Sequence, residues 1–252
     1  RDKSLGYIPS GIIAVTGATS SGSCDDIAQV SEVAKEEGLY MHVDAAWAGS
    51  AMICSEYRNL WKGIENADSI VFNPHKWLGA QFDCSVQFLK DKNIQKNTLS
   101  ILPEYLKTKG VEGITNLSDY TIQLGRRFRA LKLWFLMRSE GLAGLRNMIR
   151  NHVDWTKELH DKLEKLDNIE IITKPILSLF TFRFVNRERK NIDELNERII
   201  QEINDEGEIY LTPTKVDGKY VIRFTSGTFE MTKDDMEVAY ETIIDKLNKS
   251  SN

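Results

Sequence analysis

The order of elements between residues 11 and 43 constrains the fold of this chain more than any other feature. A strand-length apolar run (residues 11–16) ends in the small, polar stretch 17–23, which has the composition of a loop. A helix is expected from Asp25 or Asp26, either of which can cap it, to about Glu37, with Gly38 as its stop. The apolar run 39–43 completes a strand–loop–helix–strand unit. Such a unit holds its strands parallel, so the sequence predicts an α/β fold with a parallel-rich sheet.

The expected secondary-structure pattern changes twice in the rest of the chain. Further strands are expected at 69–72 and 85–89, and residues 95–116 show no periodicity and are expected to form a long loop. Residues 125–166 have a helical pattern. A small α+β domain is expected after Asp167, with these elements: strands 169–172, 177–184, 209–214 and 220–224, and helices 192–203 and 232–247. We therefore predict two units, 1–134 from a large domain and 135–252 comprising a connecting helix and a small C-terminal domain.

Composition excludes several classes of function. The formal net charge is −4 and the lysines and arginines are scattered, which argues against a nucleic-acid partner. No apolar run reaches the length of a membrane span, so no membrane partner is predicted. The three cysteines are widely spaced, which favours reduced thiols in a cytoplasmic protein. No metal site is predicted, because no CxxC or HxxxH pair is present.

Two short segments could carry chemistry, HVDAAWAG at 42–49 and NPHKW at 73–77, and each directly follows an expected strand. Ligands of parallel α/β sheets bind at the carboxyl ends of strands, so Asp44 and Lys76 could meet in one crevice. A lysine amine can bond the aldehyde of pyridoxal 5′-phosphate (PLP), and an aspartate can keep its pyridine nitrogen protonated. Ala46 is small enough to lie against a flat ring.

The residues alone also allow purely structural roles. An aspartate at a strand end is more often a helix cap or a surface charge, and a lysine after a strand usually lies at the surface. His42 is expected to be a packed core residue, and His152 and His160 are expected at the surface. Trp134 is expected to fill a core.

The combination of motifs resembles the group II PLP-dependent decarboxylases, and within them the aromatic L-amino-acid decarboxylases. The likeness extends from about residue 8 to 247 and includes FDC at 82–84, PEYLK at 103–107 and LGRRFR at 124–129. It implies the PLP-dependent transferase fold type I, with a parallel-rich sheet in the large domain and a small C-terminal α+β domain. It also implies a homodimer with interfacial active sites. Family members are much longer, so a missing N-terminal half is expected.

The resemblance further implies roles for residues around the cofactor. Lys76 carries PLP as a Schiff base and Asp44 pairs with the pyridine nitrogen. Ala46 packs on one ring face, and Thr19 sits near the phenolic oxygen, with Asp25 behind it.

For the phosphate and the amino-acid substrate, the resemblance implies a second group. Asn73 and His75 sit near the phosphate, with His75 also close to the substrate. Tyr105 returns a proton to the substrate carbon after carbon dioxide leaves. Phe82 and Gly125 belong to the pocket for the substrate ring.

The expected activity is decarboxylation of an aromatic L-amino acid to its amine, with three alternatives. An aromatic aldehyde synthase usually has phenylalanine where this chain has Tyr105. A glutamate or cysteine sulfinate decarboxylase needs a cationic pocket. A non-catalytic interaction domain is expected to have lost Lys76 or Asp44, and both are present. Arg223 is expected to be structural.

Overall fold

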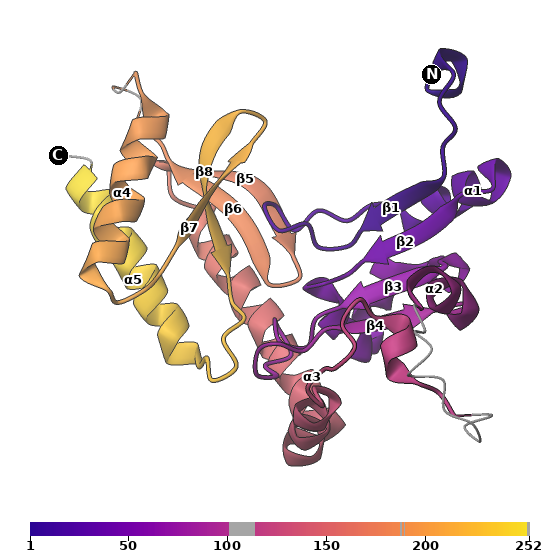
Figure 1. Cartoon of the computed structure of the whole chain (residues 1–252). Helices are drawn as coiled ribbons and strands as arrows, with labels where there is room; N and C mark the ends of the chain where they lie inside the picture. Colours follow the sequence, from indigo (N-terminus) through magenta and orange to yellow (C-terminus); the bar gives the residue numbers. More distant parts are fainter. Residues whose placement is uncertain (101–113, 187, 189, 251–252) are drawn as a thin grey trace.

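The computed structural model of this chain describes residues 1–100, 114–186, 188 and 190–250. Two four-stranded sheets lie in two lobes, joined near the bottom of the view by the long helix α3 (Figure 1). The N-terminal segment extends away from the first sheet, and the C-terminus lies beside α4 in the second lobe. The helix and strand content therefore agrees with the α/β fold class expected from the sequence.

The first sheet is parallel-rich, as predicted. Its strands, in spatial order, are β1 (Gly11–Val15), β2 (Tyr40–Asp44), β3 (Ser69–Phe72) and β4 (Val86–Leu89). The pairs β1–β2 and β2–β3 are parallel, whereas β4 runs antiparallel to β3. The carboxyl ends of the three parallel strands therefore share one edge of the sheet.

Helix α1 (Ile27–Glu37) connects β1 to β2 and begins and ends where the sequence predicts. The Asp26 carboxylate accepts a hydrogen bond from the backbone N–H of Gln29 at 3.1 Å, which satisfies an otherwise unpaired helix N–H. Gly38 ends the helix with φ of 64°, a left-handed conformation that favours glycine.

The second sheet is antiparallel. Its strands, in spatial order, are β5 (Ile169–Ile176), β6 (Leu179–Phe184), β8 (Lys219–Thr225) and β7 (Thr212–Val216). Helices α4 (Ile192–Glu206) and α5 (Lys233–Ser250) pack with it around a core that includes Phe180, Phe182 and Ile222. The Thr232 and Asp235 side chains cap α5 reciprocally, each accepting a hydrogen bond from the backbone N–H of the other. The α+β character expected of this region is confirmed.

Helix α3 (Ala130–Leu163) contributes to both cores. Leu145 and Ile149 are buried with the first sheet, while Leu159 and Leu163 are buried with the second. A kink occurs at Gly141, where φ is 64° and ψ is 170°. Because one helix serves both cores, the division of the chain at residues 134 and 135 remains a prediction.

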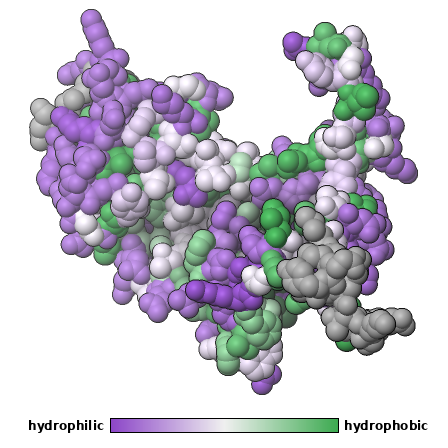
Figure 2. Space-filling view, viewed as in Figure 1, coloured by the Kyte–Doolittle hydropathy of each residue, from purple (hydrophilic) through white to green (hydrophobic). Residues whose placement is uncertain are grey.

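Three expectations are wrong. Part of the expected loop is helix α2 (Lys92–Leu99), whose N-terminus is capped by Asp91. Trp134 is half exposed rather than buried, and it lies in the N-terminal part of α3, where hydrophobic side chains reach the surface (Figure 2). His152 and His160 are buried, because both face the cores on which the C-terminal part of α3 packs.

Short 3-10 helices complete the described structure: Lys3–Leu5, Ala48–Ile53, Ser55–Trp61, Ile64–Asn66 and Leu117–Tyr120. None of the helices within the described ranges combines the length and the apolar character needed to cross a membrane.

Candidate active site

The carboxyl edge of the parallel strands brings together the segments that the sequence singled out. Asp44 is the last residue of β2 and pairs with Val71 of β3. The backbone N–H of Asn73, just after β3, donates to the Ala46 carbonyl at 2.8 Å. The backbone N–H of Thr16, just after β1, donates to the Asp44 carbonyl at 2.9 Å. Three successive strand ends are thus tied to one another at this edge.

The Asp44 carboxylate is held by its own turn. Its Oδ1 accepts a hydrogen bond from the backbone N–H of Ala46 at 2.9 Å. The residue is partly buried at the strand end, so its charge is only partly screened by water. This arrangement fixes the direction of a negative charge at the sheet edge.

Lys76 lies in the tight turn that follows β3. Its backbone N–H donates to the Asn73 carbonyl at 2.9 Å, and Pro74 accepts from the Ala80 N–H at 3.0 Å. The Lys76 side chain is exposed and forms no ion pair within the described part of the chain. A lysine held on a rigid turn with its amine accessible can act as a nucleophile toward a carbonyl.

A cleft of about 340 Å³ opens at Lys76, within the size range of small-molecule sites. Its walls come from both sheets and consist of these residues: Thr19, Trp47, Lys76, Trp77, Arg223, Thr225, Gly227 and Thr228. Of the predicted site residues, the cleft therefore brings Thr19 and Lys76 together. Asp44 lies at the adjacent strand end without lining it.

Arg223 is the functional candidate that sequence reasoning set aside. Its Nε donates to the Thr19 carbonyl at 2.7 Å, which ties β8 to the loop after β1. Burial lowers the pKa of the Arg223 guanidinium, and no carboxylate forms an ion pair with it among the described residues. The hydroxyl of Thr225 is buried nearby without a hydrogen-bond partner in that same part of the chain. The Arg223 guanidinium lines the cleft and can bind an anionic group there.

His75 is oriented from behind by the loop that carries Phe82. Its Nδ1 lies 2.7 Å from the Cys84 carbonyl and 3.0 Å from the Cys84 N–H. The Phe82 ring meets the imidazole edge-on at a centroid distance of 4.8 Å. Asp83, which lies between Phe82 and Cys84 in the sequence, forms an ion pair with Arg129 at 3.0 Å. This loop thus fixes the ring plane of His75.

The remaining predicted site residues are less closely gathered. Ala46 is partly buried after β2, and the Asn73 side chain accepts from the Ser85 hydroxyl at 2.6 Å. The Asp25 carboxylate accepts from the Val15 N–H at 2.8 Å, at the end of β1. Gly125 is exposed, with no atom within 4 Å of where a Cβ would stand. Tyr105 lies outside the described residues.

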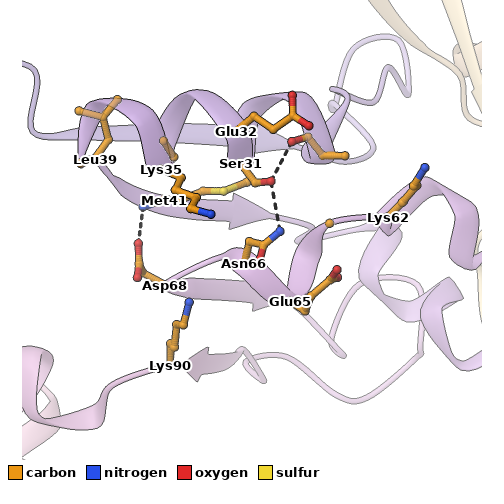
Figure 3. Close-up of a pocket in the computed structure, with 14 residues that line it drawn as sticks. Ser31, Glu32, Lys35, Leu39, Met41, Lys62, Glu65, Asn66, Asp68 and Lys90 are labelled. Atoms are coloured by element: carbon orange, nitrogen blue, oxygen red, sulfur yellow. Dashed lines mark hydrogen bonds between the residues drawn. The ribbon is translucent and has the colours of Figure 1, made fainter.

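A larger cleft, of about 660 Å³, lies at the opposite end of the same sheet (Figure 3). It lies between α1 and the starts of β2 and β3, where Asp68 accepts from the Met41 N–H at 2.8 Å. Lys35, Lys62 and Lys90 and the acids Glu32, Glu65 and Asp68 balance in charge around it. It contains no predicted site residue and lies at the amino ends of the strands, so the cleft at Lys76 is the candidate active site.

A buried histidine beneath the Lys76 cleft makes the folded chain sensitive to acid. Burial lowers the pKa of His152 to about 4, below the ordinary value of 6.5 that applies in the unfolded chain. Between these two values the unfolded chain binds more protons, so stability is lost as pH falls from about 6.5 toward 4. We expect wild type to lose roughly 2–3 kcal/mol more than His152→Asn over this window. Urea unfolding at several pH values measures the difference, and parallel losses in both proteins would contradict it.

Comparison with known proteins identifies relatives of this chain. The sequence model of the pyridoxal-dependent decarboxylase conserved domain matches residues 1–185. Aromatic-L-amino-acid decarboxylase of Mus musculus is 40% identical over 247 residues, which are 97% of this chain and 50% of that protein. Phenylacetaldehyde synthase of Arabidopsis thaliana is 39% identical over 231 residues, which are 90% of this chain and 47% of that protein.

Among solved structures, a crystal structure of Oryza sativa TDC with PLP and tryptamine superposes with a TM-score of 0.95 and 34% identity. The match covers 100% of this chain and 53% of the rice chain. This chain thus spans about half the length of the relatives that it matches.

Proposed function

This chain belongs to the pyridoxal-dependent decarboxylase family, and from that premise we propose that its protein decarboxylates an aromatic L-amino acid to the corresponding amine and carbon dioxide. The observation that carries the proposal is the placement of Asp44 and Lys76. Asp44 ends β2, and Lys76 lies in the turn after the neighbouring parallel strand β3 and lines a cleft of suitable size. A non-catalytic domain would have no need to keep a carboxylate and an accessible amine together at this edge.

The donor set around the cleft fits PLP. The Lys76 amine can hold its aldehyde carbon covalently. The Arg223 guanidinium lines the same cleft and suits the oxygens of an anionic group. When bound, PLP supplies an electron-accepting ring that stabilises negative charge on the substrate Cα.

The residues of this chain then have separate tasks in the proposal. The Asp44 carboxylate, oriented by the Ala46 N–H, would face the ring nitrogen, and its negative charge would keep that nitrogen protonated. Ala46 packs on a ring face and Thr19 lies near the phenolic oxygen. Asn73 and His75 would lie near the phosphate, and the hydrogen bonds with Cys84 would keep the His75 ring plane fixed near the substrate.

For the substrate, we favour an aromatic side chain. The relatives named above include an aromatic-L-amino-acid decarboxylase, and Phe82 offers an exposed ring beside His75. Phe82 and Gly125 remain proposed pocket residues. Arg223 is a specific observation that favours the second candidate, decarboxylation of glutamate or cysteine sulfinate, because an acidic side chain needs a cation.

A substrate panel distinguishes these candidates. We expect release of carbon dioxide from at least one of tryptophan, 5-hydroxytryptophan, tyrosine or dopa, and little from glutamate. The assay is performed with PLP on the complete protein. If glutamate or cysteine sulfinate is the best substrate, the aromatic assignment is wrong and the acidic candidate takes its place.

The aldehyde-synthase alternative depends on Tyr105, whose phenol holds a proton at neutral pH because its unperturbed pKa is about 10. We propose that it protonates the substrate Cα. Tyr105→Phe should still release carbon dioxide but shift the product from amine toward aldehyde, ammonia and hydrogen peroxide, with oxygen as the oxidant. Peroxide formed per carbon dioxide in air measures the shift. A variant that makes amine at the wild-type rate without extra peroxide would rule out this role.

We further propose that the complete protein is a cytoplasmic homodimer with active sites at the subunit interface. The three free cysteines, Cys24, Cys54 and Cys84, fit a reducing compartment. Sedimentation of the complete protein together with its activity tests the dimer, since an active monomer would contradict it.

A further inference from the structure

A buried hydrogen-bond network lies beneath the Lys76 cleft. Trp77, the residue after Lys76, is 1% exposed, and its indole Nε1–H donates to His152 Nδ1 at 3.0 Å. His152, on α3, is also 1% exposed. An indole nitrogen can only donate, so His152 Nδ1 must be the unprotonated ring nitrogen. The lysine turn is therefore fixed to α3 by one specific tautomer.

The same histidine fixes the opposite wall of the cleft. The His152 carbonyl accepts from the Ser226 hydroxyl at 2.8 Å, and Ser226 lies between Thr225 and Gly227. Because the Ser226 proton is used there, Thr156 donates to the Ser226 oxygen at 2.6 Å. Residues 225–228 are thus held on α3 next to the point where Trp77 is held.

The two walls also meet directly. A Cβ on Gly227 would stand 3.7 Å from the Trp77 ring, and one on Gly79 would stand 2.1 Å from the Phe229 ring. Trp77 also stacks on Trp47 at a centroid distance of 5.1 Å and an angle of 17°. A shift of Trp77 would therefore displace Lys76 and both walls of the cleft together.

We propose that His152 is a positioning residue for Lys76: its imidazole fixes the Trp77 indole and thereby sets the place of the lysine amine relative to Thr225 and Thr228. This inference rests on the proposed function. A misplacement of about 1 Å can cost about 100-fold in rate, so loss of the acceptor should lower kcat. A histidine that only filled the core would affect stability without that loss of rate.

Two variants separate the roles. In His152→Asn, the side-chain oxygen stands near the place of Nδ1 and can accept from Trp77. In His152→Leu, similar volume remains but no acceptor does. We expect kcat to fall about 10- to 100-fold in His152→Leu with KM within about threefold of wild type. His152→Asn should recover most of the rate.

A matched control comes from the same helix. His160 is buried against Phe180 in the other core, at a ring distance of 5.5 Å, and does not line the cleft. His160→Leu should lower stability to urea but leave kcat within about twofold of wild type. If His160→Leu and His152→Leu lose rate equally, the effect is general destabilisation and the proposal fails.

A readout independent of turnover is the visible circular dichroism of bound PLP, which reports how the cofactor is oriented. Its amplitude should fall in His152→Leu and return in His152→Asn. If wild type binds PLP without decarboxylating any amino acid, the proposed function is wrong, and this signal still tests His152.

Trp77→Phe provides a second route, because it removes the donor and keeps an aromatic ring. It should lower kcat as His152→Leu does, and the double variant should be no slower than either single variant. The Trp77→Phe variant therefore still tests the proposal if His152→Leu does not fold. Unchanged kcat and circular dichroism in Trp77→Phe, or an asparagine variant as impaired as the leucine variant, would overturn the proposal.

Discussion

Lys76→Arg should retain the positive charge of this turn and lose the covalent attachment of PLP. A guanidinium is a poor nucleophile, whereas a lysine amine can bond the aldehyde. The turn itself should survive, because it is held by backbone hydrogen bonds and the side chain is exposed. We expect decarboxylation to fall by on the order of 1,000-fold or more.

Borohydride reduction followed by peptide mapping measures the attachment directly. In wild type the label should appear on the peptide that contains Lys76, and in Lys76→Arg it should disappear. Lys62→Arg is the matched control, since Lys62 lines the cleft at the opposite end of the sheet. Labelling of a different lysine in wild type would remove the basis of the proposed site.

The local elements were predictable because their signals are local. Helix α1 has a capping aspartate, a polar face and a terminal glycine within a few residues, and Asp26 and Gly38 serve as expected. The strand ends at Asp44 and Lys76 were predictable for a related reason. Parallel strands joined by a helix must present their carboxyl ends at one edge, so two motifs far apart in sequence meet there.

Other elements depend on context that the pattern does not contain. Helix α2 is short and polar, with no buried residue, so it has no apolar period to detect. The N-terminal part of α3, in contrast, has a strong apolar pattern although several of its apolar side chains are exposed. Trp134 and Phe135 have helical spacing and large apolar side chains, yet they are 50% and 58% exposed among the described residues. Periodicity identifies the helix but cannot tell what covers each face.

Half of the cleft was missed because its second wall comes from the antiparallel sheet. Arg223 and Thr225 lie at the end of β8, about 150 residues after Lys76 in the sequence, and no local motif links the two segments. Trp77 was visible within NPHKW, but the acceptor that its buried indole requires could not be located. That acceptor is His152, which the sequence places on a helix but whose burial depends on the two cores that this helix faces.

Asp44→Asn should lower kcat by on the order of 1,000-fold while leaving the fold intact. In wild type the Ala46 N–H donates to the Asp44 carboxylate at 2.9 Å. An asparagine side-chain oxygen can accept the same hydrogen bond, so the turn after β2 should be kept. The substitution removes the negative charge that we propose holds the ring proton, and removing one major electrostatic stabiliser typically costs about 100- to 1,000-fold. Asp68→Asn is the matched control. Its carboxylate also accepts from a backbone N–H, that of Met41, but it lies at the other end of the sheet. Steady-state kcat at saturating PLP, with urea unfolding beside it, separates charge from structure. If both variants stay within a few-fold of wild type, the Asp44 carboxylate serves only to hold its turn.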